Sequence, residues 1–260
     1  MLQKNEFKSK YLNTQIKTTM LTPDSVKDPK AVLILLHGSF TSEGDYSTFD
    51  CIPNELNLQR LCDDNKILVI LPFMERNCYY ISSNGFDCDS FLAKELPAFA
   101  CEKHPEIKGK EIVLGGYSMG GYGAVLVGIH TRRFKRILSI SGAFIQNDLI
   151  IGNPEICGQS TPDRIAETES FMHYFKPFSD LEESSDRNVV RALQTFPVEI
   201  EKPSIFLSCG SLDRLYKRNL VLVRELQEQS FEYCFTPFEG GKHDFECFSS
   251  GIQEGVKWLF

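Results

Sequence analysis

The chain has 260 residues, of which 42% are hydrophobic, and it carries a formal net charge of −7 at pH 7. A chain of this length can bury a sizeable core within one domain. Its acidic residues are spread along the chain and it has no basic cluster, which argues against nucleic acid and anionic membranes as partners.

The cysteines and the N-terminus indicate a compartment. The nine cysteines are an odd number, none are spaced as Cys-x-x-Cys, and several lie in apolar segments. We therefore expect buried free thiols in a reducing environment and no zinc site. The N-terminal residues have no apolar run typical of a signal peptide, and no run approaches the ~20 residues that span a bilayer. The sequence predicts a cytoplasmic protein.

Apolar runs and helical periodicity alternate along the chain. Weak alternation over 6–20 predicts one or two antiparallel edge strands. Short apolar runs then predict strands at 31–36, 67–71, 111–115, 136–141, 203–208 and 231–236. Helical periodicity is present at 52–63, 89–103, 119–132, 215–229 and 249–260. This alternation predicts an α/β fold, in which a mostly parallel central sheet has helices on both faces.

Two segments depart from that pattern. Pro97 lies inside the expected helix 89–103, where it removes a helical hydrogen bond and should kink or restart the helix. Residues 144–200 are polar and aromatic by turns and too long for a plain loop. We expect a small lid or insertion there, over the carboxyl edge of the sheet, within a single domain that spans 1–260.

The stretch "GGYSMGGYGA" (115–124) surrounds Ser118 with glycines. Residues 116–120 read G-x-S-x-G, directly after an apolar strand and at the start of a helical pattern, which is the setting that makes this motif informative. In such a sharp turn the apex backbone is strained. Gly116 and Gly120 allow strand and helix to approach, and Ser118 is lifted above the sheet. The alternative is a glycine-rich turn that only packs tightly.

A serine nucleophile needs a base, and in this arrangement an acid and then a histidine follow the serine in the chain. His37 precedes the serine, and His130 lies about three turns along the following helix. His104 ends a helix, where we expect it to be exposed, and His173 lies in the lid segment, where packing or substrate contact is the alternative role. His243, in the glycine-rich loop "EGGKHDF" after the last strand, is the predicted base.

For the acid, Asp213 follows the strand in "IFLSCGSLDRLY". A parallel strand delivers side chains to the carboxyl edge at this point. An N-cap role is the alternative, and Asp213 could combine the two. Asp244 and Glu239 are the competing carboxylates.

Two backbone N–H groups are candidates for an oxyanion hole. Met119 begins the helix after the serine, where N–H groups lack helical acceptors. Ser39 lies in "LILLHGSF", after the first core strand, and Phe40 is the next choice. His37 in the same loop has a structural role as its alternative.

Six segments carry a family resemblance: "LLHGSF", "YYISSNGFDCDSFLAKELPAF", "GGYSMGGYGA", "RILSISGAF", "CGSLDRLYKRN" and "GGKHDFECF". Together they run nearly end to end and resemble the tributyrin-esterase and cinnamoyl (feruloyl) esterase group of the esterase D-like α/β-hydrolases. The resemblance implies the α/β-hydrolase fold, with Ser118 as nucleophile, Asp213 as acid and His243 as base. It also implies Ser39 and Met119 as oxyanion donors. The chain departs from the family pattern at Ser39, where an apolar residue is usual, and at Phe245 and Phe248, where tryptophans are common.

These observations predict a serine carboxylesterase that hydrolyses small acyl esters, short-chain or aromatic, through an acyl-enzyme and without a metal or cofactor. Phe40, Tyr117, Phe171 and Tyr174 are the expected substrate contacts. Two other reactions of the same residues are thioester hydrolysis, as in the S-formylglutathione hydrolases, and acyl transfer. A non-catalytic binding protein is a further alternative, against which the intact triad argues. The sequence does not decide the oligomeric state. A homodimer that forms through an edge strand or the final helix is an alternative to the monomer.

Overall fold

The structure is a computed structural model that describes residues 1–39, 46–74, 80–82, 85–146 and 188–260. Across these ranges eight strands form one sheet, in the order β1-β2-β4-β3-β5-β6-β7-β8. The first two pair antiparallel and the last six run parallel to one another. The strands are β1 (Leu2–Lys8), β2 (Gln15–Leu21), β3 (Ala31–Leu36), β4 (Ile67–Pro72), β5 (Glu111–Tyr117), β6 (Arg136–Ile140), β7 (Ser204–Gly210) and β8 (Tyr233–Phe238). The predicted mostly parallel sheet with an antiparallel edge is confirmed.

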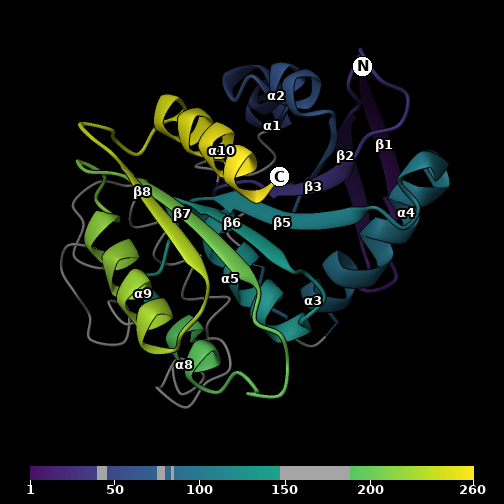
Figure 1. Cartoon of the computed structure of the whole chain (residues 1–260). Coiled ribbons are helices and arrows are strands. Elements are labelled where there is room, and N and C mark those ends of the chain that lie inside the picture. The colour runs from purple at the N-terminus through teal and green to yellow at the C-terminus, as the bar shows by residue number, and fades with distance from the viewer. Residues whose placement is uncertain (40–45, 75–79, 83–84, 147–187) are drawn as a thin grey trace.

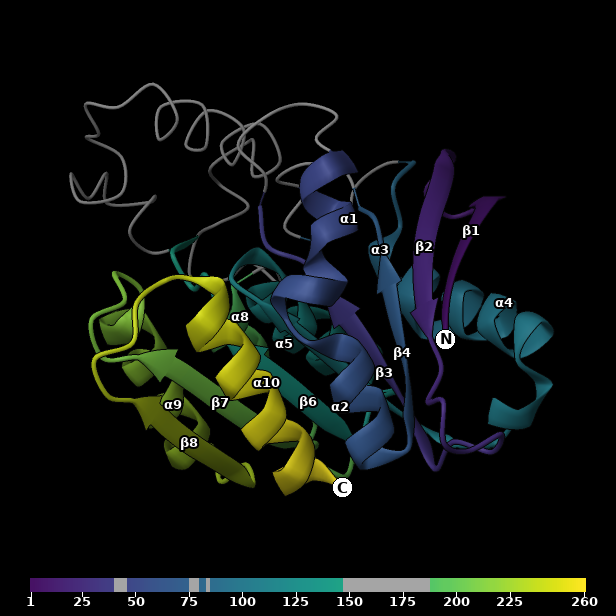
Figure 2. The ribbon, with the colours of Figure 1, turned by 90° about the horizontal axis from the view of Figure 1, so that it is seen from above.

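Helices cover both faces of the sheet (Figures 1 and 2). One face carries α1 (Tyr46–Glu55), α2 (Leu58–Asn65) and α10 (Phe245–Leu259). The other carries α3 (Cys88–Ser90), the π-helix η1 (Phe91–Glu95), α4 (Leu96–Lys103), α5 (Met119–Thr131), α8 (Val189–Gln194) and α9 (Tyr216–Glu228), with the short 3₁₀ helix η2 (Pro105–Ile107) after α4.

The central strands supply the core of both layers. Every residue of β3 and β4 is buried, as expected for parallel strands covered on both faces. Side chains alternate between the faces, so Val32 and Ile34 belong to the cluster beneath α5, whereas Leu33 and Leu35 belong to the cluster beneath α10.

The strand register brings several loops to one edge of the sheet. Leu36 of β3 pairs with Gly116 of β5, and Tyr117 of β5 pairs with Ile140 of β6. Because parallel strands end at the same edge, the segments that follow β3, β5, β6 and β7 meet there. This edge therefore holds Ser118 and the predicted acid turn.

The helix around Pro97 widens instead of stopping. Residues 91–95 form a π-helix, and α4 follows directly with Pro97 in its first turn. Proline has no N–H for the carbonyl four residues earlier, and a π-turn is a common way to absorb that loss within a continuous helix. The disturbance expected at Pro97 therefore takes the form of a π-turn within a continuous helix, and the helix does not restart.

Two other predicted helices have different bounds in the structure. The expected helix 52–63 is divided into α1 and α2, because Asn57 adopts a left-handed conformation with φ of 52°. The expected helix 249–260 begins earlier, at Phe245, where the Asp244 side chain caps it.

Residues 147–187 of the predicted lid lie outside the described residues. The described end of that segment holds α8, which packs against α5 and α9, with Val189 and Leu193 buried. This end is part of the helical layer on the α5 face, and the lid itself stays a prediction.

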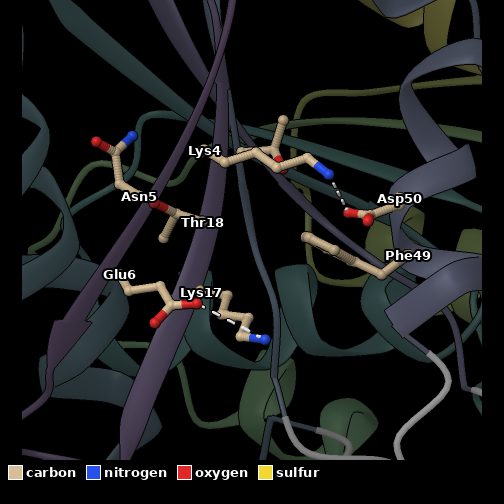
Figure 3. A pocket seen from close by; sticks show the side chains of 8 residues that line it. Lys4, Asn5, Glu6, Lys17, Thr18, Phe49 and Asp50 are labelled. Carbon is tan, nitrogen blue, oxygen red and sulfur yellow. Dashed lines mark ion pairs between the residues drawn. The ribbon is translucent and has the colours of Figure 1, made fainter.

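Figure 3 shows a hollow between the β1–β2 edge and α1. Its charged residues are paired: Lys4 Nζ lies 2.8 Å from an Asp50 oxygen, and Lys17 Nζ lies 3.7 Å from a Glu6 oxygen. None of the predicted catalytic residues is among its described lining. No helix in the described ranges has the length and apolar character needed to cross a bilayer.

Candidate active site

Ser118 occupies the turn between β5 and α5 in a strained conformation, with φ of 54° and ψ of −120°. A non-glycine residue at such angles persists only when its surroundings hold it. Its N–H donates to the Ile140 carbonyl at 2.9 Å, and its carbonyl accepts from the N–H groups of Tyr122 at 3.1 Å and Ala143 at 3.0 Å. The main chain of Ser118 is thus fixed on both sides.

The flanking glycines permit this turn. A Cβ atom at Gly116 would lie 2.3 Å from the Gly120 carbonyl oxygen, and one at Gly120 would lie 2.1 Å from the Leu36 carbonyl oxygen. Both contacts are with backbone, which cannot move aside as a flexible side chain can. The concentration of glycine around Ser118 therefore has a steric cause.

Ser118, His243 and Asp213 form one hydrogen-bonded chain. His243 Nε2 lies 3.0 Å from Ser118 Oγ, and His243 Nδ1 lies 2.8 Å from Asp213 Oδ2. The Asp213 side chain is fully buried and the His243 side chain is 21% exposed. The structure thus brings together the three residues that the sequence predicts as base, acid and nucleophile.

The environment of Asp213 keeps its carboxylate ionised. Burial raises the pKa of this group, but the hydrogen bond and charge of His243, the Leu215 N–H and the neighbouring Ser141 side chain outweigh burial and leave the pKa below its ordinary value. The Leu215 N–H donates to Oδ1 at 2.8 Å. An ionised Asp213 accepts the Nδ1 proton of His243, so Nε2 is free to accept a proton from Ser118.

The competing carboxylates have other partners. Asp244 Oδ1 accepts the Cys247 N–H at 3.0 Å and caps α10. Glu239 is exposed and lies 3.3 Å from the Ser211 hydroxyl. Asp213 does not act as the N-cap of α9, which begins after Leu215.

The other described histidines also have partners. His104 Nδ1 lies 3.0 Å from a Glu106 oxygen, and its side chain is only 14% exposed, so the expectation that it is exposed is wrong. His130 Nδ1 lies 3.4 Å from an Asp89 oxygen. His173 lies outside the described residues.

His37 has a structural environment. It is fully buried; its Nδ1–H donates to the Gly38 carbonyl at 2.7 Å and its Nε2 accepts the Met74 N–H at 2.9 Å. Burial lowers the pKa of His37 to about 4, against the smaller opposing effect of these backbone contacts. The ring is therefore neutral and ties the loop after β3 to the loop after β4.

The loop that follows His37 runs beside Ser118. A Cβ atom at Gly38 would lie 3.3 Å from Ser118 Cβ, so Ser39 follows a residue that already touches the turn. Met119 is the first residue of α5, where N–H groups have no acceptor in a preceding helical turn. The role of the Ser39 and Met119 N–H groups as oxyanion donors stays a prediction.

Of the expected substrate contacts, Phe40, Phe171 and Tyr174 lie outside the described residues. Tyr117 is 4% exposed and stacks on Phe248 with ring centroids 4.9 Å apart. Burial raises the pKa of its phenol. These contacts give Tyr117 a packing role, and its contact with substrate stays a prediction.

Phe248 and Asn219 have roles in the site that the sequence alone does not predict. Phe248 meets His243 edge-on, with centroids 4.9 Å apart and planes at 83°, and so supports the imidazole from α10. Its position in the resembling segment "GGKHDFECF" was the available signal. Asn219 is a fully buried amide on α9. An asparagine on the buried face of an amphipathic helix was the only signal for it.

Two thiols lie close enough to Asp213 to sense its charge, but they are poor nucleophiles. Burial, with the nearby Asp213 charge, raises the pKa of Cys209 and raises that of Cys247 to about 11. A thiol must ionise to attack. Both are free, as are the other five cysteines in the described ranges.

Known proteins resemble this chain in sequence and in fold. A family model described as "Putative esterase" matches residues 9–259. An acetyl esterase of Caldicellulosiruptor saccharolyticus is 28% identical over 236 residues, which cover 87% of this chain and 82% of that protein.

Solved structures share the fold. A fluorophosphonate-binding serine hydrolase of Staphylococcus aureus superposes with a TM-score of 0.77 at 19% identity, covering 100% of this chain and 98% of the other. An S-formylglutathione hydrolase of the same organism gives 0.76 at 19% identity, covering 100% and 99%. The α/β-hydrolase fold and the esterase resemblance are confirmed. The chain is a carboxylic ester hydrolase and belongs to the family described as "Putative esterase".

Proposed function

We propose that Ser118, His243 and Asp213 are the catalytic triad of a serine carboxylesterase that hydrolyses small acyl esters. The observation that supports this is the continuous chain of hydrogen bonds from Ser118 Oγ through His243 to the buried Asp213 carboxylate. A nucleophile within hydrogen-bond reach of a base, which a third group orients, is the arrangement that acyl transfer requires.

The reaction proceeds through an acyl-enzyme. As Ser118 Oγ attacks the ester carbonyl, its proton passes to His243 Nε2, and Asp213 stabilises the imidazolium through Nδ1–H. The N–H groups of Ser39 and Met119 donate to the oxyanion. His243 then returns the proton to the departing alcohol as the C–O bond breaks. A water molecule, deprotonated by His243, releases the carboxylic acid and restores the Ser118 hydroxyl.

A short or aromatic acyl group is the proposed substrate preference. The acetyl esterase relative supports the short-chain reading, and the aromatic residues Phe40, Phe171 and Tyr174 are the proposed contacts for a larger acyl group. The reaction as written uses no metal or cofactor. The free cysteines of the described ranges support the proposal of a reducing, cytoplasmic setting.

Thioester hydrolysis is the second candidate reaction, because an S-formylglutathione hydrolase shares the fold. The same triad can expel a thiol or an alcohol. Rates with a thioester and an oxygen ester of the same acyl group separate the two readings: a higher kcat/KM for the oxygen ester supports the carboxylesterase.

The deciding experiment replaces the nucleophile. Ser118→Ala should lower kcat for an activated short-chain aryl ester by roughly 10⁴-fold or more, whereas Ser25→Ala, at an exposed position, should leave kcat unchanged. Acetyl, butyryl and feruloyl esters should be compared in the wild type. Ser118→Ala with wild-type turnover in a folded protein would overturn the proposal.

A further inference from the structure

Asn219 lies on α9, one helical turn past the acid turn, and is fully buried. Its side-chain amide makes three hydrogen bonds. Oδ1 accepts the Gly142 N–H at 3.2 Å, and Nδ2 donates to the carbonyls of Gly142 and Leu215, each at 3.0 Å. Both donors and one acceptor of the amide are therefore used in a place that water does not reach.

The orientation of this amide is determined by its partners. With the oxygen and nitrogen exchanged, the NH₂ group would face the Gly142 N–H, and the oxygen would face two carbonyls. Asparagine has a low helix propensity, and a buried amide without partners is costly. Helix formation does not explain this residue, whereas its three contacts do.

Each of the two segments that Asn219 joins makes a hydrogen bond to one of the three proposed catalytic residues. On one side, Ala143, which follows Gly142, donates its N–H to the Ser118 carbonyl at 3.0 Å. On the other, the Leu215 N–H donates to Asp213 Oδ1 at 2.8 Å. Ser118 follows β5 and Asp213 follows β7, and β6 lies between them in the sheet. The amide of Asn219 therefore connects the segment after β6, at Gly142, with the segment after β7, at Leu215.

The helix does not depend on the Asn219 side chain for its own start. The main-chain N–H of Asn219 also donates to the Leu215 carbonyl at 3.0 Å, as does that of Arg218. Without the side-chain amide, this carbonyl keeps those two partners. The link to Gly142 is what would be lost.

We propose that Asn219 is a positioning residue: it fixes the acid turn relative to the turn that carries Ser118, and so keeps Asp213, His243 and Ser118 aligned. This inference rests on the proposed function of that triad. Asn219 does not contact the reacting atoms and acts through Leu215 and Gly142. A small displacement of a catalytic group has a large effect on rate, because the reacting geometry must be held within fractions of an ångström.

The test compares two variants of the same helix. Asn219→Ala removes the bridge, and we expect kcat for a short-chain aryl ester to fall by roughly 30- to 100-fold while KM changes by less than about threefold. Leu222→Ala is the control, because Leu222 is 1% exposed and faces the core. It should lower the melting temperature at least as much with kcat near that of the wild type. Both variants are assayed well below their melting temperatures.

A second measurement reads the triad directly. The proton that His243 shares with Asp213 gives a downfield proton NMR resonance, which we expect to shift or broaden in Asn219→Ala and to stay in place in Leu222→Ala. If Asn219→Ala does not fold, Asn219→Asp takes its place, because it keeps the size and the acceptor but loses donated bonds.

Equal kcat losses in the Asn219 and Leu222 variants, or an unshifted resonance, would overturn the inference while leaving the triad intact. Wild-type turnover by Ser118→Ala would instead overturn the proposed function.

Discussion

His37 and His243 are two histidines at the same edge of the sheet with opposite environments. His37 is fully buried, and both its ring nitrogens are bound to main-chain groups of Gly38 and Met74. His243 is partly exposed, and its ring nitrogens meet a hydroxyl and a carboxylate. Each ring has two hydrogen-bond partners, so partner count does not distinguish them.

The kind of partner distinguishes the two rings. A peptide carbonyl and a peptide N–H neither release nor accept a proton near neutral pH, and burial keeps His37 uncharged, with a pKa of about 4. A serine hydroxyl can release a proton when a base is aligned with it, and an ionised carboxylate stabilises the resulting imidazolium. A histidine is therefore suited to catalysis by what it touches, and the following predictions test this contrast.

The largest expected effect is the loss of kcat on replacing His243, which contrasts with the loss of stability on replacing His37. His243→Ala should lower kcat by roughly 10⁵-fold with little change in melting temperature, because the side chain is partly exposed. His37→Asn should act mainly on stability: it removes a buried, fully bonded ring and should cost about 2–4 kcal/mol of unfolding free energy, with a far smaller loss of kcat than His243→Ala. Steady-state kinetics and denaturant unfolding of both variants measure this. If His37→Asn lost as much kcat as His243→Ala, the distinction between a structural and a catalytic histidine would be wrong.

The next effect concerns the carboxylate that orients His243. Asp213→Asn keeps the shape of the side chain but removes the negative charge and favours the wrong ring tautomer, so kcat should fall by roughly 10³- to 10⁴-fold. Measuring kcat of the wild type and of Asp213→Asn at several pH values checks this loss. A loss of less than about threefold would place the acid elsewhere, and Asp244 would be the residue to examine next.

His37 also predicts a loss of stability in acid. Its pKa falls from 6.5 to about 4 in the folded protein, so between these values the unfolded chain binds a proton that the folded chain does not. Unfolding free energy is unaffected above pH 6.5, declines as pH falls, and loses about 3 kcal/mol from this group by pH 4. Asp213 acts in the same direction, but below its ordinary pKa of 3.8.

Urea unfolding from pH 7 to pH 4.5 measures the decline. His37→Asn should flatten the slope by up to about 1.4 kcal/mol per pH unit, whatever its stability at pH 7. If the unfolding free energy of the variant had the same pH dependence as that of the wild type, the pKa of His37 would not be lowered by burial.

The sequence predicted the sheet well for a physical reason. Strands such as β3 and β4 are buried on both faces, so their apolar runs are continuous and visible without a structure. The break at Asn57 is not visible in the sequence, because a left-handed residue between two amphipathic helices leaves the hydrophobic period almost unchanged.

The candidate site was predictable where chain order and local motif carry the information. Ser118 follows from its glycines, and His243 follows from its place after the last strand. Asn219 was not predictable, since its contacts join residues 77 positions apart in the chain. Only the sheet order, which brings β6 between β5 and β7, makes that contact.

The smallest expected effect is that of replacing Asp244. Although Asp244 is the direct neighbour of His243 in the chain, we expect its loss to change kcat far less than the loss of the Asp213 charge. Asp244 Oδ1 accepts the Cys247 N–H at the start of α10, so Asp244→Ala should cost about 1 kcal/mol of unfolding free energy, as the loss of an N-cap does. Asp244→Asn, which can still cap, should recover most of this. Because the Asp244 carboxylate does not bind the imidazole, kcat should stay within about twofold of the wild type in both variants, against the 10³-fold loss or more for Asp213→Asn. A large kcat loss in Asp244→Ala that Asp244→Asn fails to restore would mean that charge beside His243, and not only its bonded partners, sets its reactivity.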